Sequence, residues 1–383
     1  MMQRARSRAL LALAFLSFPL VARAQGTLST QGFGYPTGGM STRSLGTGGA
    51  ITEFDPLSST NPAAMPSIGG GALYVQMEPE FRQLSVGAGT ESARISRHPL
   101  AFVAFPLRPS VMAGLSLSNL LDRSFETNER RVQTVGAEQL ATTNFFKSDG
   151  AIGDVRLALA WTPANWIRLG AGAHAITGDN RLRSTQQFDD SARFATIIDT
   201  STVTYVGTAV SAGVDLFLAN TVALGASFRK GGSMSVKHGD TTLSKANVPD
   251  RMSFSIGYIG IRGTTIAART SKDTWSNMRG LGSLTLPISD DWDTSVGADV
   301  LGPRLGQRSF QVRAGARWRT LPFGLATTAV KEKSASLGLG TTFSRGRIAL
   351  DVTGIRAMRD PVSSAVDIRE KAWTISAGLT VRP

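Results

Sequence analysis

The sequence contains no cysteine, so it can hold neither a disulfide framework nor a thiolate metal site. Only three histidines are present, His98, His174 and His238, and their scattered positions match no metal-binding spacing. No GxSxG motif is found, so catalysis is not expected, and His174 is interpreted as a hydrogen-bonding residue. After residue 24 there is no apolar run of the roughly 20 residues that a membrane helix needs. If the chain spans a membrane, it must do so as a β-barrel.

The first 24 residues have the organisation of a cleaved export signal. Basic residues precede an apolar run over residues 9–21, and Ala22 and Ala24 place small side chains where a signal peptidase reads them. The apolar run is too short for a membrane anchor, which needs roughly 20 residues. We therefore expect export and cleavage after Ala24.

The chain is basic, with a formal net charge of +13, or +9 once the four arginines of the signal are removed. A basic balance suits nucleic acid, an anionic surface or an anionic solute. Export and the even spread of the arginines argue against nucleic acid. The expected partners are outer-membrane lipid, the barrel assembly machinery and a hydrophobic small molecule; no cofactor and no metal is expected.

From about residue 71 onward, apolar and polar side chains alternate with the two-residue period of β-strands. In the final segment, Trp373, Ile375 and Leu379 fall on one face, and Ser376 and Thr380 fall on the other. Segments of about 9–11 residues suit strands that cross a bilayer at a tilt, whereas soluble strands are typically about five or six residues long. The pattern predicts transmembrane strands with lipid-facing and lumen-facing sides.

The positions of three tryptophans predict which face of the strands meets lipid. Trp161, Trp318 and Trp373 share the apolar face of three different segments. We expect all three to face lipid near the membrane boundaries, as girdle aromatics do. A one-residue error in register would turn them into the lumen.

Short and long connections alternate along the chain. Tight turns are expected at residues 106–110, 162–165, 218–221, 289–292, 320–323 and 344–346, and long polar loops at residues 122–149, 178–202, 230–248 and 357–369. Short periplasmic turns and long extracellular loops are typical of outer-membrane barrels. The sequence therefore predicts an all-β fold, a closed antiparallel transmembrane β-barrel of about 14–16 strands. The barrel occupies residues 71–383, after a signal peptide (residues 1–24) and a segment without sustained periodicity (residues 25–70).

A run of motifs precedes the first expected strand. It consists of Arg43, Leu45, Gly46, Gly48, Gly49 and Ala50, then Asp55, then Asn61, Pro62 and Ala63. The order and spacing resemble the N-terminal signature of the FadL/PorV-type outer-membrane barrel superfamily. That superfamily includes transporters for long-chain fatty acids and aromatic hydrocarbons, and type IX secretion barrels. The chain departs from such barrels at its end, where Pro383 stands in place of an aromatic residue.

The resemblance implies that residues 25–70 fold into the barrel as a plug, with residues 61–63 near the periplasmic end. A Gly- and Pro-rich segment can fill a lumen without regular structure because its backbone is shielded from lipid. The side-chain amide of Asn61 can cap a helix or form a turn, and the ring of Pro62 fixes the φ of Pro62 itself, the residue after Asn61. The alternative is a disordered periplasmic leader.

Charged side chains fall on the predicted lumen face. The lumen-lining candidates are Arg156, Arg168, His174, Arg229, Asp299, Arg313, Arg317, Arg347 and Asp351. An arginine on the lipid face costs about 2–4 kcal/mol at mid-membrane. We therefore expect Arg313, Arg317 and Arg347 to point inward, with Asp351 close enough to pair with one of them. Such charges either brace the wall as salt bridges or form a cationic path for an anionic solute.

Three functions are compatible with a barrel in the cell outer membrane. The first is passive uptake of hydrophobic or amphipathic, fatty-acid-like solutes. The second is a PorV-like scaffold for secretion or surface attachment. The third, a barrel enzyme, has no supporting motif. An apolar lumen pocket of roughly 300–1,000 Å³ would favour uptake, and a tightly filled lumen would favour a scaffold.

Overall fold

The computed structural model describes residues 34–383, except residues 88, 136–137, 282–287, 306–307, 326–327 and 362–367. The expected signal peptide, its cleavage site and residues 25–33 lie outside the described residues. In the part of the chain that is described, no helix has the length and apolar character needed to cross a membrane.

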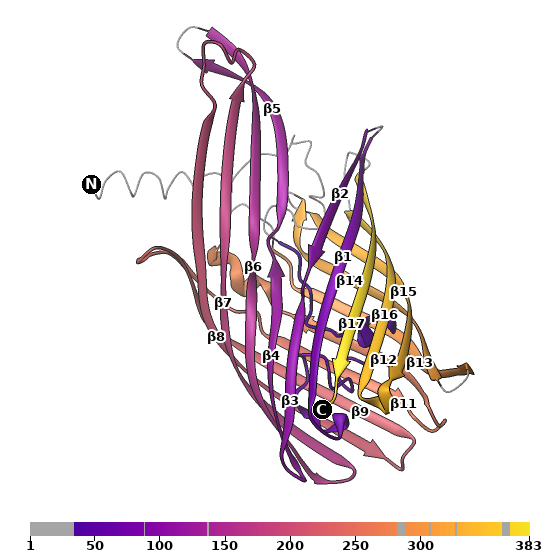
Figure 1. Ribbon diagram of the computed structural model, residues 1–383. Helices are drawn as coiled ribbons and strands as arrows, with labels where there is room; N and C mark the ends of the chain where they lie inside the picture. Colours follow the sequence, from indigo (N-terminus) through magenta and orange to yellow (C-terminus); the bar gives the residue numbers. More distant parts are fainter. Residues whose placement is uncertain are drawn as a thin grey trace.

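Seventeen strand segments form one antiparallel sheet that closes on itself (Figure 1). Their bounds are β1 (Ala72–Val86), β2 (Gly89–Arg97), β3 (Leu100–Arg108), β4 (Val111–Asp122), β5 (Phe125–Val135), β6 (Glu138–Ala164), β7 (Ile167–Phe188), β8 (Ile197–Leu218), β9 (Val222–His238), β10 (Thr241–Asn247), β11 (Arg251–Tyr258), β12 (Thr264–Asp273), β13 (Asp291–Leu305), β14 (Arg308–Leu325), β15 (Thr328–Phe343), β16 (Ile348–Pro361) and β17 (Ile368–Val381).

Three of the strands are interrupted by short breaks, so the seventeen segments make a 14-stranded barrel. The breaks separate β2 from β3, β4 from β5, and β10 from β11. The barrel closes where β17 pairs with β1, with Val381 opposite Leu73. The predicted fold class is confirmed, at the lower limit of the expected strand number.

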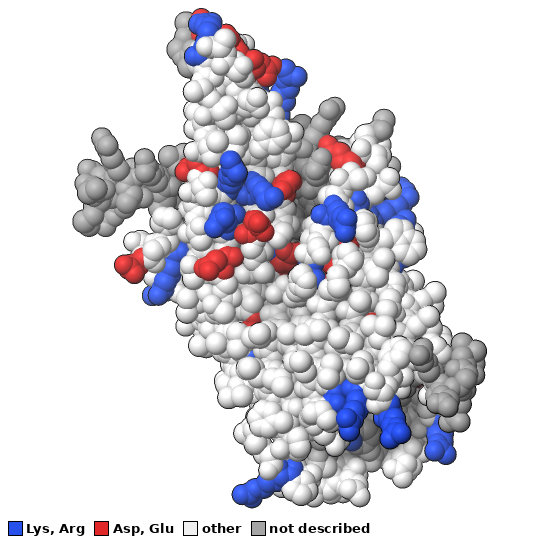
Figure 2. Space-filling model, viewed as in Figure 1, with Lys and Arg blue, Asp and Glu red and all other residues white. Residues whose placement is uncertain are grey.

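Outward apolar side chains alternate with inward polar ones along the strands. In β17, Trp373 is exposed and Ser376 and Thr380 are buried. Trp161 and Trp318 also point outward, which confirms the expected register. Figure 2 shows a broad band nearly free of charge, with Lys and Arg at one end and charges of both signs towards the other. An apolar outer belt around a polar interior suits a barrel in lipid.

The two ends of the barrel differ in their connections. Short turns, such as residues 109–110, 165–166 and 219–221, lie at the end that holds Pro383. At the other end, β5 to β8 rise well beyond the rest of the wall (Figure 1). Three of the expected long loops are largely β-hairpins, with pairing that continues to Val135 opposite Glu138, to Gln186 opposite Ile197 and to His238 opposite Thr241. Their polar side chains on both faces hid the strand pattern in the sequence.

Two of the expected tight turns are wrong. Residues 320–323 lie inside β14, and residues 289–292 lead into β13. Pro322 suggested the first turn, but it lies at an irregularity in the ladder between Leu321 and Leu325. Proline is tolerated at such a bulge because no ladder hydrogen bond is needed there.

Residues 34–70, called the inner segment below, lie within the barrel (Figure 1). The segment contains the short helix α3 (Thr42–Gly46), whose first turn is capped by Ser41, and the 3₁₀ helix η1 (Pro62–Ile68). Helix α3 packs against β14 to β17, and η1 packs against β4 and β6 to β8 on the opposite wall. The 3₁₀ helices η2 (Trp275–Leu281) and η3 (Ser344–Gly346) lie in connections between strands.

Candidate functional site

Glycines bring the backbone of the inner segment into contact with the wall. Gly48 and Gly49 have φ values of +68° and +94°, a region that residues with a Cβ rarely adopt. A Cβ on Gly315 would lie 2.0 Å from the carbonyl carbon of Thr47, and one on Gly297 would lie 2.2 Å from the Thr47 oxygen. The motif residues buried beside them are Leu45, Gly46 and Ala50. The glycine run therefore allows the two backbones to touch.

Two charged residues of the motif hold this loop in place. Arg43 Nε donates to Asp299 Oδ2 on β13 at 3.0 Å. Asp55 Oδ2 accepts hydrogen bonds from Ser41 Oγ at 2.5 Å and from Ser58 Oγ at 2.6 Å. Arg43 thus ties the segment to the wall, and Asp55 ties the segment to itself.

Asn61 connects the second half of the inner segment to β8. Its amide Nδ2 donates to Glu53 O and to Asp215 Oδ1, both at 2.8 Å, and its Oδ1 accepts from the Ala63 N–H at 2.9 Å. A Cβ on the wall residue Gly213 would lie 1.9 Å from Asn61 Oδ1. Pro62 is the first residue of η1. This part of the segment lies near the short-turn end of the wall.

Tyr35 is surrounded by buried charges, a feature that the sequence did not reveal. Four guanidinium groups lie 4.7–5.4 Å from its ring centre. The Tyr35 cluster consists of Tyr35 with Arg82, Arg97, Arg319 and Arg359 and the acidic residues Glu80, Asp122, Glu332 and Glu370. The Tyr35 hydroxyl donates to Glu332 Oε2 at 3.0 Å, and burial raises the pKa of the phenol. The neutral ring therefore fixes the start of the inner segment among balanced charges.

The lumen-lining candidates occupy three kinds of position. Those buried on the inner face are Arg156, His174, Arg229, Asp299, Arg313, Arg317 and Asp351. Arg168 is only partly buried near the short-turn end, where it donates to Ser67 Oγ and its guanidinium lies over the Phe217 ring. The expectation for Arg347 is wrong, because this residue is exposed. Its parity matches that of Asp351, but β16 begins at Ile348, so Arg347 belongs to the turn outside the wall.

Arg313 and Arg317 form ion pairs with carboxylates on other strands of the wall. Arg313 Nη1 lies 2.5 Å from Asp351 Oδ1, and its Nε lies 3.2 Å from Asp299 Oδ2. Arg317 Nη2 lies 2.7 Å from Asp293 Oδ2. The expected proximity of Arg313 and Asp351 is confirmed, and the geometry favours a bracing role over a free cationic path.

Replacing Arg313 with glutamine is expected to destabilise the barrel by about 1–3 kcal/mol, because two buried carboxylates lose a charged donor. The preference for solutes should not change. Urea unfolding in lipid vesicles and uptake of a fatty acid beside its methyl ester would check the two outcomes. Selective loss of fatty-acid uptake would instead support a cationic path.

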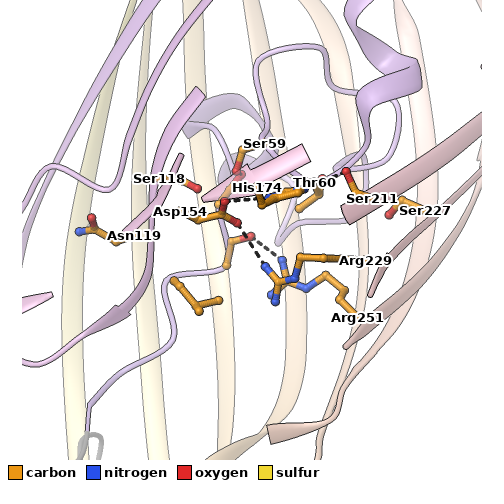
Figure 3. Close-up of a pocket in the computed structure, with 13 residues that line it drawn as sticks. Ser59, Thr60, Ser118, Asn119, Asp154, His174, Ser211, Ser227, Arg229 and Arg251 are labelled. Atoms are coloured by element: carbon orange, nitrogen blue, oxygen red, sulfur yellow. Dashed lines mark hydrogen bonds and ion pairs between the residues drawn. The ribbon is translucent and has the colours of Figure 1, made fainter. Parts of the chain in front are cut away.

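A small polar pocket lies beside the inner segment (Figure 3). Its lining includes the wall side chains Asp154, His174, Ser211 and Arg229, together with Gly38 and Gly39 of the inner segment. The room inside is about 20 Å³, enough for a water molecule. This pocket is far smaller and more polar than the apolar ligand pocket that would favour uptake, so it does not meet that criterion.

Above this pocket, towards the end where β5 to β8 project, the lumen becomes apolar. Leu120, Ile152 and Ile176 of the wall belong to one buried cluster with Trp275 and Met278 of η2. The remaining buried members are Leu121, Val203, Tyr205, Ala209, Met234, Val236, Val248, Leu281, Ile288 and Phe323. This set is called the upper apolar cluster. A water-filled lumen is lined by polar side chains. This part of the lumen is therefore suited to apolar groups rather than to water.

The wall is not fully paired next to the upper apolar cluster. The registers found among the described residues join β2 to β1 and β5 to β6, and none joins β2 to β5. The two segments diverge towards the projecting end (Figure 1). Tyr35 forms an isolated bridge with Asp122 at the end of β4, so the inner segment begins at the foot of this gap.

The comparisons with solved structures agree with this architecture. A FadL homologue from Pseudomonas aeruginosa superposes with a TM-score of 0.62 at 14% identity, covering 91% of this chain and 99% of the other. The toluene transporter TodX of P. putida gives 0.58 at 14% identity, covering 90% and 98%. The monoaromatic hydrocarbon channel CymD gives 0.54 at 12% identity, covering 90% and 98%. No family model and no curated protein matches the sequence. The chain has the fold of a FadL-type outer-membrane β-barrel.

Proposed function

We propose that this protein takes up hydrophobic or amphipathic compounds across the outer membrane. The observation that carries the proposal is the upper apolar cluster inside the lumen. Apolar side chains facing one another across a lumen can hold an apolar solute, because each buried CH₂ group contributes about 0.8 kcal/mol. The names of the similar structures, a toluene transporter and a monoaromatic hydrocarbon channel, support the same class of solute.

The inner segment acts as a plug in this proposal. It fills the lumen below the cluster and is held by the wall glycines, by Asn61 and by the Tyr35 cluster. A solute that reaches the upper apolar cluster therefore leaves sideways through the gap between β2 and β5, or downward after the inner segment moves. The small size of the polar pocket makes the downward route dependent on such a movement.

Uptake by proteoliposomes tests the proposal. Replacing Met278 with glutamine places an amide in the upper apolar cluster without changing a wall strand, since Met278 lies on η2. An unpaired amide in apolar surroundings costs about 1–3 kcal/mol, so uptake of a fatty acid and of its methyl ester should both fall roughly tenfold.

The matched control is Met358→Gln on the outward face, where the side chain is half exposed. This variant should leave uptake unchanged. Liposomes that take up both compounds equally with and without the protein would contradict the proposal and favour a secretion or attachment scaffold.

A further inference from the structure

Three side chains on adjacent strands form a connected Ser–His–Asp series in the lumen (Figure 3). His174 Nδ1 on β7 lies 2.7 Å from Asp154 Oδ1 on β6, and His174 Nε2 lies 2.8 Å from Ser211 Oγ on β8. All three residues are buried on the inner face. Because a carboxylate only accepts hydrogen bonds, His174 Nδ1 carries a hydrogen, and in the neutral imidazole Nε2 is then free to accept from the serine hydroxyl.

We propose that Ser211 and His174, positioned by Asp154, form a serine esterase centre for esters of hydrophobic carboxylic acids. In this arrangement the serine is the nucleophile, the imidazole is the general base, and the carboxylate fixes the tautomer and orientation of the imidazole. The second carboxylate oxygen, Asp154 Oδ2, is held by Arg229 Nη1 at 3.5 Å. The proposal rests on the uptake function only for the delivery of the substrate.

A second, independent observation points to an anionic group beside Ser211. Arg156 is almost fully buried, yet its Nε and Nη1 have no hydrogen-bond partner among the described residues. Arg156 lies opposite His174 in the β-ladder. A Cβ on Gly172 would lie 2.8 Å from Ser211 Oγ and 3.3 Å from Arg156 Cδ. Gly172 therefore lies between the serine hydroxyl and the aliphatic stem of Arg156, and in the proposal the unpaired guanidinium stabilises the oxyanion that forms at the attacked carbonyl.

The surroundings define the class of substrate. On each of the three strands, the next inward residue towards the upper end of the lumen is apolar: Ile152 on β6, Ile176 on β7 and Ala209 on β8. All three belong to the upper apolar cluster. An ester that descends from this cluster would place its acyl chain among apolar side chains and its carbonyl beside Ser211. The described pocket has room only for a water molecule, so the proposal requires the inner segment to move to admit the ester.

The reaction needs only the ester and water. Ser211 Oγ attacks the carbonyl carbon while its proton moves to His174 Nε2, and the alcohol leaves with that proton as its C–O bond breaks. Water, for which the pocket has room, then attacks the acyl-serine and gives a proton to His174. The acyl–oxygen bond to Ser211 breaks, the acid is released, and the proton returns to the serine.

Covalent labelling and ester hydrolysis test the proposal on the full-length protein in detergent micelles. An alkyl fluorophosphonate should modify the peptide that contains Ser211, and p-nitrophenyl octanoate should be hydrolysed faster than p-nitrophenyl acetate. Ser211→Ala should abolish both signals. Ser255→Ala, which alters another buried lumen serine on β11, should change neither.

Variants of the neighbouring residues separate catalysis from packing. Arg156→Gln should lower kcat by about 10²–10³-fold with little change in KM, as loss of an oxyanion donor does. Asp154→Asn should also lower kcat without raising KM, because it favours the tautomer whose Nε2 cannot accept a proton. Retention of the barrel is checked by its heat-dependent gel shift.

The outcomes are distinct from those of the uptake experiment. Ser211→Ala should still take up a fatty acid into liposomes, because no covalent step is needed for passage. If neither labelling nor hydrolysis depends on Ser211, the esterase proposal is overturned and the three side chains only brace the wall. If hydrolysis depends on Ser211 but the protein does not increase liposome uptake, the esterase proposal is supported and the proposed transport function is overturned.

Discussion

Replacing Arg359 with glutamine is expected to lower the free energy of unfolding by about 3–5 kcal/mol, the usual result of breaking a buried charge network by removing one partner. Arg359 is almost fully buried on β16. Its guanidinium forms ion pairs with Glu80 at 2.9 Å, with Glu332 at 2.5 Å and with Glu370. Because Arg359 pairs with three different carboxylates, its loss leaves a large uncompensated charge.

The effect should extend to the inner segment because Arg359 Nη2 also donates to the Tyr35 hydroxyl at 3.0 Å. The Tyr35 cluster contains four arginines and four acidic residues, and the substitution leaves it with a net negative charge. Burying an unpaired charge is expensive, so the cluster must either admit water or release Tyr35.

Urea unfolding in lipid vesicles, followed by tryptophan fluorescence, measures this change. Arg356→Gln is the matched control, since Arg356 lies on the same strand with its guanidinium 4.9 Å from the outward Trp373 ring. The control should lose about 0.5–1 kcal/mol, the worth of an exposed cation–π contact. Equal losses in the two variants would show that the Tyr35 cluster contributes no special stability.

The fold could be predicted from the sequence because alternation acts locally. The alternation within each strand shows which of its faces meets lipid. In β17, Trp373 and Ser376 are enough to assign the outward and the inward face. Alternation gave the wrong position for Arg347. It predicts whether a strand residue points inward or outward, but it does not predict the residue at which the strand begins. It failed again in the projecting strand β5, whose side chains are mostly exposed or half-buried and show no apolar face.

The candidate site could be predicted only in part. The sequence placed His174 on the inner face, but its partners Asp154 and Ser211 lie 20 and 37 positions away. Which residues meet across a barrel depends on the register of neighbouring strands, and that register is set by the turns and bulges of the whole wall. Tyr35 was missed for a related reason: an isolated aromatic residue in a Gly- and Pro-rich segment shows no sign of the arginines on the distant strands that surround it.

Replacing Gly315 with alanine is expected to loosen the inner segment while leaving the wall folded. Gly315 lies within β14, where alanine fits the strand backbone, but its Cβ would overlap the backbone of Thr47 at 2.0 Å and of Gly48 N at 2.4 Å. The backbone of residues 47–48 cannot relieve this overlap by a rotamer change, as the end of a flexible side chain could. The inner segment must therefore lift from the wall at this point, and overpacking of this kind costs about 1–3 kcal/mol.

Because the chain has no cysteine, a single Cys introduced at the fully buried Ala50 reports this movement. Its reaction with a water-soluble maleimide should accelerate by roughly 10- to 100-fold in the Gly315→Ala background, in proportion to the exposed population. Gly354→Ala on β16 is the control, since no atom lies within 4 Å of the position of its Cβ. An unchanged labelling rate in Gly315→Ala would mean that the inner segment is not held by contact with the wall glycines. If both maleimide labelling and solute uptake become faster, the contact between the Thr47 backbone and Gly315 on β14 would be the one that keeps the lumen closed.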